Sequence, residues 1–389
     1  MRGKVALLAI ALVSCKDKQA EPIVPSPSTS KTFDLALPSA PPPPTPSQPS
    51  FTASDLPRID VHTHVEPGCL PHAIALAAQH HIAHIVNLSG GDVGQGLEES
   101  IAEAKAVGHT TVFTTPDFRD VRRGGGFAAR MVARLKQAKA LGARGVKITK
   151  GLGLGYVTAA GTMLAVDDRS LDPLFDAAGK LGMPIAIHTG DPKAFWQPLN
   201  VANERFDELV VHPQWSFFGI PLSWEDLYAQ FERRVARHPK TTFIGVHFGN
   251  DPEDPDRVGQ MLDHYPNLMI DTAARIPEIG RNDARHGQKR MRAFFERYQD
   301  RILFGTDLGV GAGESDLMLG SMGADPPGPS DVTRFFDSSW RFFETDQKEI
   351  PSPTPIQGRW NVDGIALPRA ILEKVYFKNA ERVIGMKLD

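Results

Sequence analysis

The chain has 389 residues, of which 41% are hydrophobic and 23% are charged, so it can form one large domain with a tail or two small domains. The formal net charge of −3 and the mixing of Lys and Arg with Asp and Glu argue against nucleic-acid binding. Its two cysteines, Cys15 and Cys69, do not form a disulfide framework. Because no basic residue flanks Cys69 to lower its pKa, we interpret it as a small loop residue rather than a catalytic thiol.

The first residues have the features of a signal peptide. Arg2 and Lys4 precede the apolar run Val5–Val13, which has about nine residues and is too short to cross a bilayer about 30 Å thick. The run ends in Leu-Val-Ser-Cys at residues 12–15, which resembles the lipobox of bacterial lipoproteins. The sequence therefore predicts a lipoprotein signal peptide over residues 1–14 and lipidation of Cys15. The alternative is an ordinary secretory signal with an incidental cysteine.

A linker rich in Pro and Ser is predicted over residues 15–53. It contains few large apolar side chains, so it cannot bury enough surface to offset its ordering entropy and should be disordered or extended. We therefore expect a domain outside the cytoplasm that is held in the bacterial cell envelope only by its lipid. Lys16, rather than Asp, follows Cys15, which favours the outer membrane.

Residues 54–389 alternate β-rich runs with helical patterns. The β-rich runs cover residues 59–62, 82–88, 110–114, 146–148, 184–188, 241–247, 268–271 and 302–305. The helical patterns include residues 127–141, 223–236, 254–264 and 284–298. Eight strands that alternate with helices imply parallel pairing and favour a closed (β/α)₈ TIM barrel. Insertions are expected after strand five, over residues 193–222, and after strand eight, over residues 310–365, as active-site loops or as a packed cap.

Candidate metal ligands lie at the ends of these strands. His62 and His64 lie two residues apart on strand one, so both imidazoles should point to the same side. His188, His247 and Asp307 end strands five, six and eight, each beside a glycine-containing turn. Singly, such a histidine is usually a framework residue and such an aspartate an N-cap. Together, imidazoles and a carboxylate favour a divalent cation, Zn²⁺ first, with Mn²⁺, Fe²⁺ or Co²⁺ as alternatives.

This constellation resembles the amidohydrolase superfamily. The closer resemblance is to the amidohydrolase-related branch that includes aminocarboxymuconate-semialdehyde decarboxylase. It is carried by the D-x-H-x-H motif at residues 60–64, by Leu-Phe-Gly-Thr-Asp at residues 303–307 and by a closing helix at residues 367–385. The resemblance covers residues 54–389 and implies a metal-dependent enzyme that acts on a small molecule.

The resemblance also implies roles for single residues. His62, His64 and His188 would bind the metal, and Asp307 would be a further ligand and the proton shuttle. His247 would bind a second metal or stabilise charge that develops on the substrate. Lys147 lies at the strand-four position where binuclear members carry a carboxylated lysine, so it is a tentative ligand.

Three functions follow from these roles. The first is a hydrolase that uses activated water on an amide, lactone or ester bond. The second is a decarboxylase of an aromatic or enoic carboxylic acid. Its substrate carboxylate would bind basic residues that are equally plausible as surface charges, namely Arg122, Arg123, Lys150 and Lys193. The third is a lipoprotein that uses the barrel only to bind a ligand.

Replacing the lipidated cysteine tests the predicted anchor. We expect Cys15→Ser to move the protein from the membrane fraction to the soluble fraction, because lipidation supplies the predicted membrane contact. Cell fractionation with immunodetection measures the change. A variant that stays with the membrane would refute lipidation at Cys15.

Overall fold

The computed structural model describes residues 51–313 and 316–388. The predicted signal peptide, Cys15 and nearly all of the predicted linker lie outside the described residues. Within the described ranges, none of the helices has the length and apolar character needed to cross a membrane.

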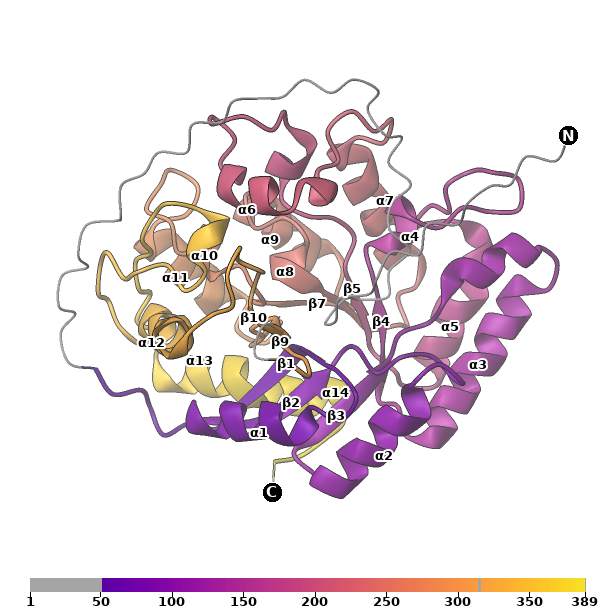
Figure 1. Ribbon diagram of the computed structural model, residues 1–389, viewed down its shortest axis with the longest axis horizontal. Helices are drawn as coiled ribbons and strands as arrows, with labels where there is room; N and C mark the ends of the chain where they lie inside the picture. Colours follow the sequence, from indigo (N-terminus) through magenta and orange to yellow (C-terminus); the bar gives the residue numbers. More distant parts are fainter. Residues whose placement is uncertain (1–50, 314–315, 389) are drawn as a thin grey trace, which may run out of the picture.

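The central element is a curled sheet of ten strands surrounded by helices (Figure 1). The strands are β1 (Arg58–Val65), β2 (Ile82–Asn87), β3 (Thr110–Thr114), β4 (Gly145–Ile148), β5 (Ile185–Ile187), β6 (Phe243–Gly245), β7 (Leu268–Asp271), β8 (Ile302–Leu303), β9 (Leu308–Val310) and β10 (Leu317–Leu319). Their order in the sheet is β10-β9-β1-β2-β3-β4-β5-β6-β7-β8. Neighbouring strands are parallel except β9 and β10, so the parallel arrangement predicted from the alternation is confirmed.

The sheet closes through the chain segment that follows β8. The backbone N–H of Val61 donates to the carbonyl of Phe304 over 3.0 Å, and that of Asp307 donates to the carbonyl of His62 over 2.9 Å. β9 then pairs with the end of β1. The predicted eighth strand, residues 302–305, is therefore interrupted: Asp307 adopts a left-handed conformation with φ of 66°, which separates β8 from β9. The predicted TIM barrel is confirmed.

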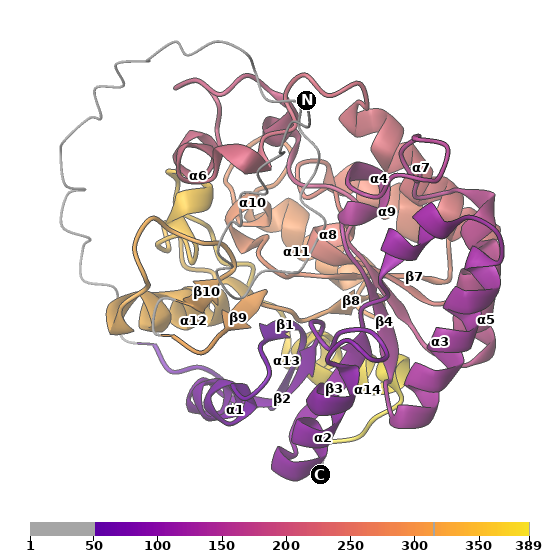
Figure 2. The ribbon, with the colours of Figure 1, turned by 45° about the vertical axis from the view of Figure 1, so that its right-hand side comes forward.

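Helices cover the outside of the barrel (Figure 2). The longer ones are α1 (Leu70–Gln79), α2 (Leu97–Val107), α3 (Phe127–Leu141), α5 (Asp172–Lys180), α7 (Trp224–Arg237), α9 (Pro255–His264), α11 (Gln288–Arg297) and α12 (Pro329–Glu344). α3 has the predicted bounds and buries Met131 and Leu135, while α9 begins after Asp254, whose side chain accepts from the backbone N–H of Arg257. α11 begins four residues later than the predicted helix over residues 284–298.

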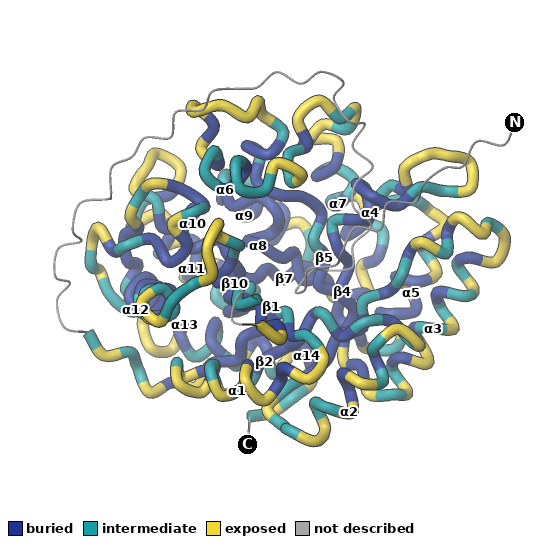
Figure 3. The backbone as a smooth tube through the Cα atoms, in the orientation of Figure 1, coloured by how far each residue is buried: buried dark blue, intermediate teal, exposed yellow. Residues whose placement is uncertain are grey.

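Two clusters of buried hydrophobic side chains hold the barrel together, one mainly between strands and helices and one inside the strands. Figure 3 shows that the strands are buried along most of their length. The inner core consists of strand residues that include Ile59, Phe113 and Met269, together with Ala380 and Ile384 of α14 (Asn379–Ile384). α14 continues α13 (Arg369–Glu373) through a π-helical turn over Lys374–Lys378. The C-terminal helix therefore closes one end of the barrel, opposite the end from which the site residues project.

The two insertions contain secondary structure of their own. Residues 193–222 hold two 3₁₀ turns, Lys193–Trp196 and Pro213–Trp215, and the helix α6 (Phe206–Val211). Residues 310–365 hold β10, α12 and a 3₁₀ turn over Pro355–Gln357. The second insertion is rich in Gly, Pro and aromatic residues. Several of its aromatic side chains form the buried face of α12.

An ion pair joins the start of β1 to the end of α12. Arg58 is fully buried, and its Nη2 lies 2.6 Å from Oε1 of Glu344. The guanidinium also lies 4.1 Å from the ring centroid of Trp340 and 4.5 Å from that of Tyr376. Because Arg58 can hardly be hydrated there, Glu344 is the group that compensates its charge.

We expect Glu344→Ala to lower the free energy of unfolding by about 3–5 kcal/mol, because it leaves Arg58 as an uncompensated buried charge. Urea unfolding followed by circular dichroism measures the change. Asp263→Ala is the matched control, since the pair that Asp263 forms with Arg297 is exposed and should contribute about 1 kcal/mol or less. Similar losses for the two variants would contradict the buried-charge explanation.

Candidate metal centre

The two histidines of β1 face each other at the end of the barrel. Nε2 of His64 lies 3.3 Å from Nε2 of His62, so the two imidazoles converge as the spacing of two residues predicts. The pairing of β1 with β2 shifts register between Asp60 and Thr63. The shift explains how Val61 packs in the inner core while the next residue, His62, lies in the site.

Asp271, the last residue of β7, determines which nitrogen of His62 faces the site. Its Oδ2 lies 2.8 Å from Nδ1 of His62, and its Oδ1 accepts from the backbone N–H groups of His247 (2.8 Å) and Ala273 (3.2 Å). An ionised carboxylate can only accept, so Nδ1 of His62 carries the proton. Nε2 of His62 then presents its lone pair toward His64, which is the state that a metal ligand needs.

His247 lies in a left-handed turn and not at the end of a strand. β6 ends at Gly245, and the next residues include His247 with φ of 54° and Phe248 with φ of 58°. Nδ1 of His247 lies 2.9 Å from the carbonyl of Ala273, which can only accept, so Nδ1 carries the proton and Nε2 has the lone pair. Burial lowers the pKa of His247 well below its usual value, and the charge of a protonated His188 would lower it further. The ring is therefore neutral.

Asp307 completes the cluster at the end of the barrel. Its Oδ1 lies 3.4 Å from Nε2 of His62 and 3.3 Å from Nε2 of His64. Burial raises the pKa of Asp307, but His62 and His64 outweigh burial and hold the pKa well below its usual value. The side chains of His64 and Asp307 are each 13% exposed, so a small molecule can reach this side of the cluster.

A second buried carboxylate, Asp60, holds the loop that carries Asp307. Asp60 accepts from the backbone N–H of His62 over 3.1 Å and from the backbone N–H of Thr306 over 3.0 Å, and also from the Thr306 hydroxyl. Burial raises the pKa of Asp60 to about 7, although these hydrogen bonds lower it. Asp60 thus fixes β1 and the residue before Asp307 relative to each other.

His188 lies beside His247, with 4.4 Å between their ring centroids. Its Nε2 is 3.5 Å from Oδ1 of Asp191, whose Oδ2 accepts from Nζ of Lys150 over 2.6 Å. Burial lowers the pKa of His188 to about 4, so its imidazole is neutral. Nε2 of His188 is buried and has no hydrogen-bond partner among the described residues.

Lys147 projects from β4 into the same region. Its side chain is buried, and Nζ lies 3.1 Å from Nε2 of His62. The amino group therefore competes with a metal ion for the lone pair of that nitrogen. The same position would place a carboxylated lysine against His62.

Among the described residues, two groups of His, Cys, Asp or Glu side chains offer ligand atoms that lie within 4.8 Å of one another: His62, His64 and Asp307, and His62, His247 and Asp271. Neither group contains His188. Imidazole and carboxylate donors, with the Nδ1 protons of His62 and His247 bound elsewhere, fit a divalent cation. The residues of this site therefore fit the metal that the amidohydrolase resemblance implies.

The basic residues proposed for a substrate carboxylate lie elsewhere or are paired. Arg122 and Arg123 are exposed on the 3₁₀ turn Phe118–Arg123, and Arg123 pairs with Asp120. Lys150 is bound to Asp191, and Nζ of Lys193 lies 2.7 Å from Oδ1 of Asp251. Cys69 is buried before α1, and burial raises the pKa of its thiol, which does not favour a reactive thiolate.

The sequence interpretation missed Asp271 and Asp191. Asp271 ends the run Leu-Met-Ile-Asp, which is the same strand-end signal that identified Asp307, so this residue could have been found. Asp191 lies three residues beyond His188 in a loop. Nothing in the local sequence distinguishes Asp191 from a surface charge.

The chain is similar to one protein-family model and to several solved structures. An amidohydrolase family model matches residues 59–386. Similar solved structures include an uncharacterised TIM-barrel protein from Bordetella bronchiseptica, with 16% identity, a TM-score of 0.48, and coverage of 85% of this chain and 99% of that chain. They also include 2,6-dihydroxybenzoate decarboxylase from Rhizobium (15% identity, TM-score 0.46, coverage 85% and 99%). A third is dihydroorotase from Campylobacter jejuni (13% identity, TM-score 0.47, coverage 87% and 87%). No curated protein sequence matches the chain significantly. Because the family model matches most of its length, the chain belongs to the amidohydrolase family.

Proposed function

We propose that this protein is a metal-dependent hydrolase that cleaves an amide, lactone or ester bond of a small molecule. The observation that carries the proposal is the cluster of His62, His64 and Asp307, with ligand atoms 3.3–3.4 Å apart at a partly exposed end of the barrel. Neutral imidazoles and an ionised carboxylate are the protonation states that bind a divalent cation.

The metal ligands in this proposal are His62, His64, Asp307 and His188. Zn²⁺ is the favoured ion because it prefers a small number of imidazole and carboxylate donors. Nε2 of His188 is buried without a hydrogen-bond partner among the described residues, so it is available as a ligand. When bound, a divalent cation supplies Lewis-acid activation of water and of a carbonyl group.

Asp307 is proposed to move the proton during hydrolysis. It contacts both imidazoles of β1 through Oδ1, which leaves Oδ2 for proton transfer. An ionised Asp307 can accept a proton from the attacking water and later donate it to the leaving group. The left-handed backbone of Asp307, fixed by the bond from its N–H to the carbonyl of His62, holds the carboxylate in place.

The geometry favours a different role for His247 from the expected stabilisation of a substrate oxyanion. The single proton of a neutral His247 is bound to the carbonyl of Ala273, so Nε2 cannot donate a hydrogen bond to a substrate oxygen. An acceptor role, or binding of a second metal, is compatible with the lone pair on Nε2 of His247, whereas His62 has no further ligand atom for a second metal because its Nδ1 proton is bound to Asp271. Carboxylation of Lys147 would favour such a binuclear site, because the modification replaces the positively charged amino group by a carboxylate that can bind metal.

Decarboxylation of a carboxylic acid is the second candidate function. The buried amino group of Lys147, 3.1 Å from Nε2 of His62, favours an anionic substrate. The metal ligands would be the same, and a general acid would protonate the carbon atom that loses the carboxylate. Release of CO₂ distinguishes this reaction from hydrolysis.

We also propose that the enzyme acts outside the cytoplasm as an envelope lipoprotein anchored through Cys15. The proposal is supported by the lipobox-like sequence at residues 12–15. The barrel begins with β1 at Arg58, so the residues between Cys15 and this strand would serve as the tether.

We expect His62→Ala and His188→Ala to lose the bound metal, because each removes one of about four ligands of a zinc-type site. Metal content per chain, measured by inductively coupled plasma mass spectrometry after dialysis, checks this. His264→Ala on α9 is the control, since His264 is exposed and bonds to a backbone carbonyl of its own helix. Full metal content in His188→Ala would remove His188 from the ligand set, and full content in His62→Ala would contradict the site.

We expect Asp307→Asn to lower turnover by about 10²–10⁴-fold while the fold is retained, because the amide replaces the carboxylate in shape but cannot accept the proton. Turnover is measured on a panel of lactones, esters and amides, and CO₂ release on carboxylated aromatic and enoic acids. Hydrolysis without CO₂ release supports the first candidate function, and CO₂ release from the acids supports the second. Near-normal turnover by the Asp307→Asn variant would show that the carboxylate of Asp307 does not transfer the proton.

A further inference from the structure

The two ring nitrogens of His64 have different surroundings. Nε2 belongs to the metal centre and lies 3.3 Å from Nε2 of His62 and 3.3 Å from Oδ1 of Asp307. Nδ1 lies 2.7 Å from the hydroxyl oxygen of Ser89, which is partly buried in the loop that follows β2. The imidazole of His64 therefore connects the metal centre to this loop.

The hydroxyl of Ser89 differs in kind from the groups that hold the other two imidazoles. Nδ1 of His62 is bound to a carboxylate, and Nδ1 of His247 is bound to a backbone carbonyl. Both of these groups can only accept, so they fix a proton on Nδ1, whereas a hydroxyl can either donate or accept. Ser89 is therefore compatible with both neutral tautomers of His64.

Each tautomer of His64 matches one state of the metal centre. With the proton on Nε2, the imidazole donates toward Oδ1 of Asp307 and the hydroxyl of Ser89 donates to Nδ1. With the proton on Nδ1, the hydroxyl accepts and Nε2 presents the lone pair that a metal ligand requires. The change from one state to the other needs a rotation of the hydroxyl group but no movement of the backbone.

The backbone around Ser89 is fixed by the side chain of Asn87, the last residue of β2. Oδ1 of Asn87 accepts from the backbone N–H of Ser89 over 2.9 Å and from that of Val65 over 3.1 Å, and Nδ2 donates to the carbonyl of Val65 over 3.0 Å. The next residue, Gly90, packs so closely on β3 that a Cβ atom there would lie 2.3 Å from a backbone carbonyl oxygen of this strand. Because Val65 directly follows His64, Asn87 fixes the backbone of the serine and of the histidine relative to each other.

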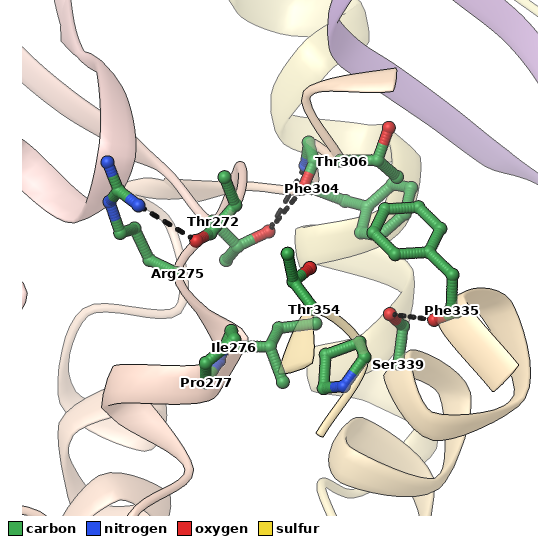
Figure 4. A pocket seen from close by; sticks show the side chains of 12 residues that line it. Thr272, Arg275, Ile276, Pro277, Phe304, Thr306, Phe335, Ser339 and Thr354 are labelled. Carbon is green, nitrogen blue, oxygen red and sulfur yellow. Dashed lines mark hydrogen bonds between the residues drawn. The ribbon is translucent and has the colours of Figure 1, made fainter. Parts of the chain in front are cut away.

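The loop that carries Asp307 is also held in place. The hydroxyl of Thr272 donates to the carbonyl of Gly305 over 3.1 Å and accepts from the backbone N–H of the same residue over 3.1 Å (Figure 4). The cavity that these residues line has room for about one water molecule, so the loop has little space to withdraw. A different proton position on His64 is therefore accommodated by the hydroxyl of Ser89 rather than by a shift of Asp307.

We propose that Ser89 is a positioning residue that lets His64 change from a hydrogen-bond donor to Asp307 into a metal ligand. This inference rests on the proposed function, because it places a divalent cation at the cluster of His62, His64 and Asp307. The change conserves protons: Nε2 gives its proton to water, Nδ1 takes a proton from water, and the hydroxyl of Ser89 turns from donor to acceptor. The side chain of His64 is 13% exposed, so water reaches the ring.

The affinity of the purified full chain for Zn²⁺, measured by competition with a chromophoric chelator, tests the role of Ser89. We expect Ser89→Ala to bind Zn²⁺ about 10–100-fold more weakly than wild type, because the Nδ1–H group of His64 loses its acceptor. Ser89→Thr keeps a hydroxyl and should bind Zn²⁺ like wild type. Ser223→Ala is the matched control and should also bind like wild type, because it removes an exposed hydroxyl at the start of the outer helix α7. Unchanged affinity in Ser89→Ala, or an equal loss in Ser89→Thr, would overturn the assignment.

The tautomer itself is read by ¹⁵N nuclear magnetic resonance on the chain labelled at its 13 histidines, with the signals of His64 identified by their loss in His64→Gln. We expect the proton on Nε2 after removal of metal with a chelator and on Nδ1 after loading with Zn²⁺. A serine that only packs against the ring would leave the tautomer the same in both states, and this result would overturn the proposal. A wild-type chain that binds no Zn²⁺ contradicts the proposed function, whereas a chain that binds Zn²⁺ without a change of tautomer contradicts only the role of Ser89.

Discussion

The carboxylate of Asp271 is the group on which the geometry of the site depends. It is 1% exposed, and its two oxygens accept hydrogen bonds from the imidazole of His62 and from the backbone at His247 and Ala273. One side chain thereby fixes the proton of the first histidine and the unusual backbone of the second. Because Ala273 in turn accepts from the ring of His247, the loop after β7 determines the lone-pair direction of both imidazoles.

Charge in this region is balanced over short distances by buried side chains. Asp60 lies behind the cluster and Asp191 beside it, while Lys147 and Lys150 approach from β4 and its following turn. Burial keeps His188 and His247 neutral, so the local field is determined by these carboxylates and amines. The arrangement places imidazole donors and an ionised carboxylate between fixed charges of both signs, and this combination of ligands fits a divalent cation.

Much of the fold and part of the site could be predicted from the sequence. The alternation of β-rich and helical runs was sufficient to predict the barrel. The two-residue spacing of His62 and His64 was sufficient to predict that their imidazoles converge. The sequence could not show the interruption between β8 and β9, because it arises from the left-handed backbone of Asp307 and from pairing with a distant strand. The left-handed turn at His247 could not be recognised for a similar reason: its backbone N–H is bound by Asp271 and its ring by the carbonyl of Ala273, more than twenty residues away along the chain.

The inner core of the barrel joins the first strand to the last helix. Ile59 and Ile384 belong to one hydrophobic cluster although they lie near opposite ends of the folded region. Such long-range contacts form late, after the intervening loops have closed. A nascent or truncated chain that lacks α14 would therefore display an open ring of strands whose apolar lumen faces water. Such a product would be a target for chaperones and proteases, because its exposed apolar surface promotes aggregation.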